Sequence, residues 1–163
     1  MSKQKRERYI RHITVSIDDV FSFFRSRTSS MPKPTFGGQW PVKVGGLRFR
    51  TFATKGVTCK GCGLTATHFA IEKHKDDNEV KNYHLNLWAS VDGKEILFTH
   101  DHQIARGLGG SDTLDNSEPM CESCNTRKSK GENSICNQLR AGRITKERAI
   151  EMAMDLANKK WTY

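Results

Sequence analysis

Long apolar stretches are absent from this chain of 163 residues, and their absence excludes several classes of protein. No run of about 18 apolar residues occurs, which argues against a membrane-spanning helix. The first twelve residues are charged, and no apolar stretch follows them, so they lack the features of a secretion signal. Internal repeats and low-complexity tracts are absent as well. We therefore expect a cytoplasmic protein.

Apolar residues are also scarce, at 36% of the chain, so we expect a small core that needs reinforcement, for instance by a bound metal. The length suffices for one compact domain with an extension. Residues 28–46 contain three prolines and four glycines, which is typical of a linker. We predict a basic N-terminal arm, a short helix and a linker over residues 1–46, and the functional domain over residues 47–163.

Acidic residues are few relative to basic ones. The chain has 27 lysines and arginines against 18 acids, which gives a net charge of +9. This excess favours a polyanionic partner such as nucleic acid, although many basic proteins bind nothing specific. The segment 3–11 is strongly basic, and it fits either an arm that lies along phosphates or a solvated terminus.

Five cysteines are present, and four of them form two Cys-x-x-Cys pairs, Cys59/Cys62 and Cys121/Cys124, while Cys136 stands alone. In a chain expected to be intracellular, this pattern indicates a metal site rather than disulfides. Four thiolates favour one tetrahedral zinc ion. Such a site has no open coordination position, so it would be structural, and any catalysis must lie elsewhere.

The local patterns predict a mixture of helices and strands. Ser16 and Asp19 have the spacing of a helix N-cap, and Asp92-Gly93 between two alternating runs predicts a hairpin turn. Further predictions are a strand over 47–54 with Arg48 and Arg50 on one face, a strand over 95–102, a glycine-rich loop over 104–115, a strand over 114–120, a helix ended by Gly131, a second helix over 132–141, and a last helix after Thr145. The expected fold class is α+β.

Three polar residues near the cysteines have the chemistry of phosphodiester hydrolysis. Asp101 and Asn125 offer oxygen atoms, which are the ligands that Mg²⁺ prefers. His102, when neutral, can accept a proton from an attacking water. Neighbouring strand residues point to opposite faces, so the strand must bend or end here if Asp101 and His102 are to serve one phosphate.

The stretch from residue 98 to residue 130, FTHDHQIARGLGGSDTLDNSEPMCESCNTRKSK, resembles the HNH nuclease family. The shared features are an Asp-His pair, a Gly-Gly turn, an asparagine, and Cys-x-x-Cys followed by Asn and a lysine. The resemblance implies a ββα-metal core, here stapled by the four-cysteine zinc site, with an N-terminal extension and C-terminal helices. It implies cleavage that leaves 5′-phosphate and 3′-hydroxyl ends.

Residue by residue, the resemblance implies His102 as the general base, Asp101 and Asn125 as ligands of the catalytic metal, and Asn116 as the residue that braces the loop and orients the base. Asparagine at position 125 favours Mg²⁺ or Mn²⁺ in the catalytic site, because an amide oxygen is a hard ligand. The basic residues that flank the motif are candidate DNA contacts: Arg106, Arg127, Lys128 and Lys130.

The function that these features favour is a metal-dependent DNA endonuclease that nicks or cuts both strands. Two alternatives remain open: a zinc-stabilised DNA-binding module without catalysis, and a partner in a phage packaging or assembly machine. Small proteins of this kind resemble phage and mobile-element nucleases, which would place the chain in a bacterial or phage-infected cell, and a homodimer is a further candidate assembly. His100 shares a strand face with His102, so it is a candidate second ligand or reserve base, whereas His68, His74 and His84 are expected to be structural.

Overall fold

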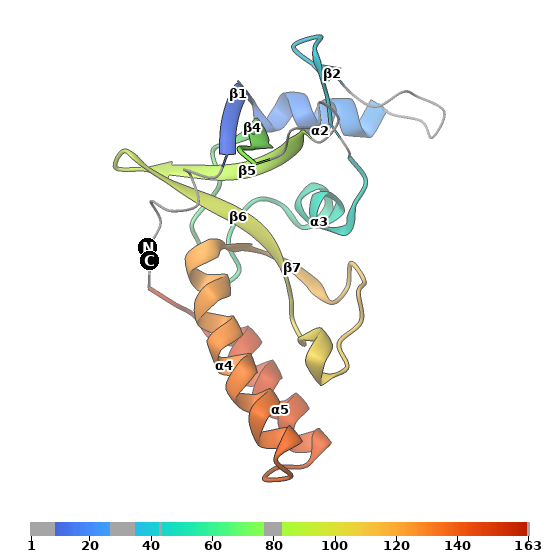
Figure 1. Ribbon diagram of the computed structural model, residues 1–163, viewed down its shortest axis with the longest axis vertical. Coiled ribbons are helices and arrows are strands. Elements are labelled where there is room, and N and C mark those ends of the chain that lie inside the picture. The colour runs from blue at the N-terminus through green and yellow to red at the C-terminus, as the bar shows by residue number, and fades with distance from the viewer. Residues whose placement is uncertain (1–8, 27–34, 43, 77–82, 163) are drawn as a thin grey trace.

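The computed structural model describes residues 9–26, 35–42, 44–76 and 83–162, and a five-stranded antiparallel sheet lies at its centre (Figure 1). The strand order is β1-β4-β5-β6-β7, and a separate two-stranded hairpin is formed by β2 and β3. The strands are β1 Tyr9–Val15, β2 Thr35–Phe36, β3 Trp40–Pro41, β4 His68–His74, β5 His84–Val91, β6 Lys94–His102 and β7 Ser117–Cys121. Together with the helices, this sheet confirms the predicted α+β class.

One face of the sheet carries the main apolar core. Helices α2 (Ile17–Ser26) and α3 (Leu47–Lys55) supply side chains to it. Phe52 of α3 shares this cluster with Phe69, Leu87 and Phe98 of the sheet, and all four are buried. Because side chains alternate along a strand, the residues between them face the opposite side, where Trp88 is buried.

The N-terminal residues that the structure describes are packed onto this sheet. Ser16 caps α2, since the Asp19 backbone N–H donates to Ser16 Oγ at 3.0 Å, which confirms the predicted helix start. β1 pairs with β4, and Val20 and Val42 belong to the main core. The division at residue 46 therefore stays a prediction, with both sides of it sharing one core.

Residues 47–55 form a helix, so the predicted strand over 47–54 is wrong. The alternation of apolar and basic residues suggested a strand, but Phe49 and Phe52 are also three residues apart and lie on the same buried side of a helix. Gly46 and Gly56 delimit it, and Gly56 has φ 87°, a conformation that favours glycine. Arg48 and Arg50 consequently project from roughly opposite sides of α3 instead of sharing a face.

The hairpin predicted at Asp92-Gly93 is confirmed: both residues have positive φ, 48° and 71°, and connect β5 to β6. The next unit consists of β6, β7 and helix α4 (Glu122–Arg140), with a short 3-10 helix, η1 (Arg106–Leu108), in the loop between the strands. The predicted strand over 114–120 is thus found as β7. The β-β-α order brings the end of β6 against the start of α4.

Helix α4 is continuous through Gly131, so the prediction of two helices separated at that residue is wrong. Gly131 instead permits a close approach, because a Cβ built there would lie 2.6 Å from Leu156 Cδ2 of helix α5 (Lys146–Asn158). The two helices lie side by side and extend away from the sheet (Figure 1). No helix in the described part of the chain has the length and apolar character needed to cross a membrane.

Candidate functional site

The four paired cysteines meet at one point. Their sulfur atoms all lie within 4.8 Å of one another, and Cys62 Sγ is 3.8 Å from Cys121 Sγ. In a tetrahedral zinc site with Zn–S bonds of about 2.3 Å, neighbouring sulfurs are about 3.8 Å apart. The loop after α3 supplies Cys59 and Cys62, the end of β7 supplies Cys121, and the first turn of α4 supplies Cys124. The donor set and its spacing fit a zinc ion.

The protein by itself stabilises the thiolate of Cys59 but not the thiolates of Cys121 and Cys124. A hydrogen bond from the Cys121 side chain, assisted by backbone N–H groups including that of Cys121, lowers the pKa of Cys59. The hydrogen bond to Cys59, together with burial, raises the pKa of Cys121, and burial raises that of Cys124 to about 12. Four ionised sulfurs at this distance therefore require a cation to offset their charge.

The C-terminal segment covers the turn Cys59-Lys60-Gly61-Cys62, the first cysteine knuckle. The Trp161 backbone N–H donates to the Gly61 carbonyl at 2.9 Å, and Lys160 Nζ donates to the Lys60 carbonyl at 2.9 Å. A Cβ at Gly61 would lie 2.7 Å from the Trp161 ring and 3.0 Å from Cys124 Cβ, so glycine is required for this contact. The knuckle thus ties the end of the chain to the start of α4.

The end of β6 presents its polar residues to two different sides of the sheet. β6 keeps its pairing with β7 through His102, which lies opposite Ser117. The strand therefore does not bend at Asp101, although it ends at His102, as the alternative expectation had it. Asp101 faces α4, whereas His100 and His102 face the other side, because alternate residues of a strand point in opposite directions.

On the α4 side, Asp101 belongs to a buried ion-pair cluster. Lys128 Nζ lies 2.8 Å from Asp101 Oδ2 and 2.5 Å from Glu132 Oε1, and it donates to the His102 carbonyl at 2.6 Å. The Lys128 side chain is 1% exposed. Burial raises the pKa of the Asp101 and Glu132 carboxyl groups, and the Lys128 ammonium opposes that rise in both. The Lys128 ammonium is thus held by three oxygen atoms, as a bound cation would be.

Asn125, the second predicted metal ligand, lies in the second turn of α4 on the same side. Its Nδ2 donates to Thr99 Oγ1 at 2.6 Å, and its Oδ1 accepts from Ser129 Oγ at 3.2 Å. Thr99 and Asp101 are alternate residues of β6, so Asn125 and Asp101 are directed to the same face of the sheet. Hydrogen bonds within the protein therefore engage both candidate ligands.

On the opposite side, His102 pairs with an acid that the sequence did not reveal. His102 Nε2 lies 2.8 Å from Asp112 Oδ1, and the His100 and His102 rings are 5.5 Å apart. Donor atoms of these three residues lie within 4.8 Å of one another. Burial, followed by the proximity of His102 and Arg48, lowers the pKa of His100, which favours its neutral form.

The loop that carries Asp112 is held by Asn116, in the bracing position that the family resemblance implied. Asn116 Oδ1 accepts from the Ile104 N–H at 3.0 Å, and its Nδ2 donates to the carbonyls of Ile104 and Ser111 at 3.0 and 2.8 Å. Gly110 is enclosed in the same loop, because a Cβ there would lie 1.8 Å from the Ile104 oxygen. Whether this brace serves catalysis stays a prediction.

The basic residues around the site differ in accessibility. Arg106, Arg127 and Lys130 are exposed, although Arg127 Nη1 also donates to the Thr162 carbonyl at 2.7 Å. Lys128 is buried, and its ammonium is engaged by oxygens, so this position does not fit the predicted contact with DNA.

Arg11, from the predicted basic arm, pairs with Glu72 at 2.9 Å and Glu95 at 2.6 Å. The predicted phosphate contact of the arm therefore depends on residues 3–8, which lie outside the described residues.

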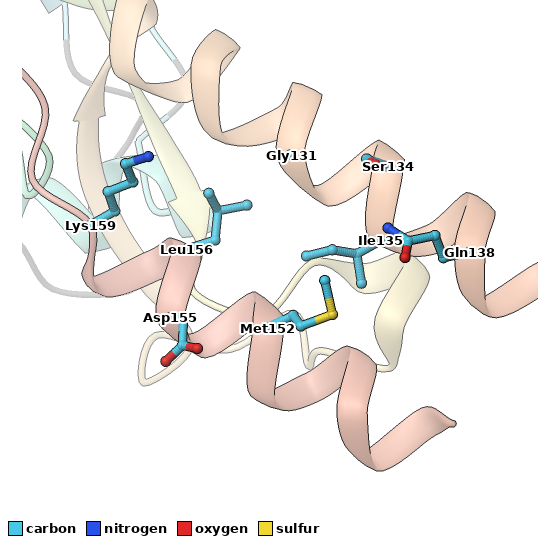
Figure 2. A pocket seen from close by; sticks show the side chains of 8 residues that line it. All are labelled: Gly131, Ser134, Ile135, Gln138, Met152, Asp155, Leu156 and Lys159. Carbon is cyan, nitrogen blue, oxygen red and sulfur yellow. The ribbon is translucent and has the colours of Figure 1, made fainter. Parts of the chain in front are cut away.

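A groove of about 410 Å³ lies between α4 and α5. Figure 2 shows Ile135, Met152 and Leu156 directed toward its centre, with Asp155 and Lys159 at its border. Its lining is mainly apolar and contains no histidine or cysteine, so the groove lacks a histidine–carboxylate pair like the one at the end of β6. The polar site at the end of β6 remains the candidate active site.

Comparison with known families assigns this site to a class. Residues 91–131 match the model of the HNH endonuclease family, and this segment spans β6, the glycine-rich loop, β7 and the first half of α4. No curated protein and no solved structure gives a significant match. Residues 91–131 therefore match an HNH endonuclease domain, which confirms the resemblance of the motif.

Proposed function

We propose that the chain is a metal-dependent endonuclease that hydrolyses DNA phosphodiester bonds with His102 as general base. The observation that supports this proposal best is the His102–Asp112 pair, at 2.8 Å, within the segment that matches the nuclease family. A carboxylate that accepts from one ring nitrogen leaves the other nitrogen able to accept a proton. Asp112 also stabilises the imidazolium that forms when His102 takes the proton from water.

The oxygen donors Asp101 and Asn125 form a hard ligand set that fits Mg²⁺ or Mn²⁺. When bound, such an ion stabilises the charge that develops on the phosphate and on the leaving oxygen. In this structure, Lys128 already neutralises Asp101. An ion at Asp101 must therefore share the carboxylate with Lys128 or displace it, so we expect metal binding of modest affinity.

DNA is the proposed substrate because the chain has a net charge of +9 and because exposed basic side chains flank the site. Arg106 lies in the loop with Asp112, and Arg127 and Lys130 lie on α4. Phosphate contacts of this kind orient the duplex without reading its sequence.

A non-catalytic DNA-binding module stabilised by zinc is the competing function. One observation favours it: Asp101 is paired with Lys128 and faces away from His102, so the two residues do not converge in this structure. The alternatives differ in what substitution of His102 does, because a binding module has no turnover to lose.

The roles of the site residues can be separated by measuring cleavage rate against Mg²⁺ and Mn²⁺ concentration. His102→Ala is expected to abolish turnover and retain DNA binding, since the proton acceptor is lost while the basic surface remains. Asp101→Ala and Asn125→Ala are expected to need more metal for a given rate. His74→Ala is the matched control, because it removes an imidazole on β4 outside the proposed site. Unchanged turnover in His102→Ala would refute its assignment as base.

A further inference from the structure

We infer that His100, His102 and Asp112 form a second metal site, for a borderline divalent ion such as Ni²⁺ or Zn²⁺, whose occupation inhibits the nuclease. The site is separate from the four cysteines and from the proposed Asp101–Asn125 ligand pair. Its existence is independent of catalysis, whereas the inhibitory effect rests on the proposed function.

The geometry carries the first part of the inference. Two imidazoles and one carboxylate present donor atoms within 4.8 Å of one another, and His102 Nε2 and Asp112 Oδ1 are already 2.8 Å apart. Metal–nitrogen bonds are about 2.0–2.1 Å long, so ligand atoms around one ion are separated by about 3–4 Å. Small side-chain rotations of His100 and Asp112 bring the three donors into that range.

The backbone beneath these ligands is fixed before any ion binds. His100 and His102 lie on one face of β6, and their pairing with Pro119 and Ser117 of β7 sets their separation. The residues on either side of Asp112 are also held: the Ser111 carbonyl accepts from Asn116 Nδ2 at 2.8 Å, and the Thr113 carbonyl accepts from Ser117 Oγ at 2.9 Å. A preorganised ligand set loses little conformational entropy on binding.

The ligand types select the class of ion. Imidazole nitrogens with one carboxylate suit Zn²⁺, Ni²⁺ and other transition metals, whereas Mg²⁺ prefers oxygen ligands. Three protein ligands leave at least one position for water, in contrast to the closed set of four cysteines. The same protein therefore offers a structural sulfur site and an open nitrogen–oxygen site.

Occupation of this site removes the proposed base. An ion bound to Nε2 of His102 takes the nitrogen that donates to Asp112, and the ring proton of the neutral imidazole then lies on Nδ1. Nδ1 therefore no longer has a free lone pair to accept the proton from water, and the ion also separates His102 from the Asp112 carboxylate. Mg²⁺-supported cleavage is then inhibited by low concentrations of Ni²⁺, even when Mg²⁺ is in excess.

The test is calorimetric titration of the zinc-loaded protein with Ni²⁺ at neutral pH, with zinc content measured throughout. Wild type is expected to bind one Ni²⁺ while it retains its zinc. His100→Ala and Asp112→Ala are each expected to weaken that binding by about tenfold or more. His74→Ala is the matched control, because His74 Nδ1 lies 3.4 Å from Asp76 but belongs to no three-ligand group among the described residues. Wild type without Ni²⁺ binding, or equal binding in wild type and both variants, overturns the site.

A second measurement separates this inference from the proposed function. Plasmid cleavage supported by Mg²⁺ is followed with increasing Ni²⁺. The rate of each protein is divided by its own rate without Ni²⁺, and the resulting inhibition curves of wild type and His100→Ala are compared. Inhibition that needs about tenfold more Ni²⁺ in His100→Ala supports the inhibitory role. Binding with undiminished cleavage overturns that role, whereas binding by a protein that never cleaves contradicts the proposed function and leaves the metal site standing. Circular dichroism of each variant shows whether it is folded.

Discussion

Substitution of Lys128 by methionine removes the ammonium that pairs with Asp101 and Glu132 and leaves these two buried carboxylates without it. The side chains of Lys128, Asp101 and Glu132 are 1%, 10% and 9% exposed, so solvent screens their interactions little. Removal of one partner from a buried ion pair costs about 3–5 kcal/mol. Methionine retains most of the volume of lysine, so the loss is attributable to charge and not to a cavity.

The assay is urea unfolding of the zinc-loaded protein, with Lys130→Met as the matched control on the same helix. Lys130 is exposed, and its substitution is expected to change the free energy of unfolding by less than about 0.5 kcal/mol. With a denaturant slope of about 2 kcal/mol per molar, Lys128→Met should lower the midpoint by about 2 M relative to that control.

The deficit of Lys128→Met should also depend on pH. Burial raises the pKa of Asp101 and Glu132 in the folded state, and loss of Lys128 raises both further. The folded state then binds protons more readily than the unfolded state, so the destabilisation is largest at neutral pH and shrinks as the pH falls through the raised pKa values. Equal midpoints for Lys128→Met and Lys130→Met at neutral pH would refute the buried cluster.

Two further predictions concern zinc and the basic arm. Cys59→Ser should lose tightly bound zinc and cooperative unfolding, because metal binding contributes directly to folding, whereas Cys136→Ser should keep about one zinc per chain by elemental analysis. A metal-free wild type that unfolds cooperatively would contradict the zinc assignment. Deletion of residues 1–8, which stops before β1, should weaken DNA binding and flatten its dependence on salt, because fewer counterions are released. Unchanged affinity and salt slope would show that the arm does not contact DNA.

Local sequence patterns predicted the hairpin at Asp92-Gly93 and the start of α2 well, because turn and cap preferences act over a few residues. The strand predicted over 47–54 failed because Phe49 and Phe52, three residues apart, also fit one face of a helix. Only packing against the sheet decides between the two structures. Gly131 was misread for a related reason. Its contact with Leu156 is a tertiary constraint that no local pattern contains.

The candidate site shows the same limit. Spacing alone indicated the four cysteines, and the motif located Asp101, His102, Asn116 and Asn125. Asp112 was missed because it reaches His102 across a ten-residue loop without a sequence signal of its own. The burial of Lys128 was missed as well, although Glu132 four residues later is the helical spacing of an ion pair and was available as a clue.

Strand cleavage by the zinc-loaded protein tests the central claim most directly. Supercoiled plasmid is incubated with wild type or His102→Ala, with Mg²⁺, with Mn²⁺ or without added divalent metal, and the products are separated by electrophoresis. The account predicts nicked or linear DNA with wild type only when Mg²⁺ or Mn²⁺ is added, and none with His102→Ala. Plasmid that binds wild type but stays supercoiled with either metal would contradict the claim that this chain is a nuclease.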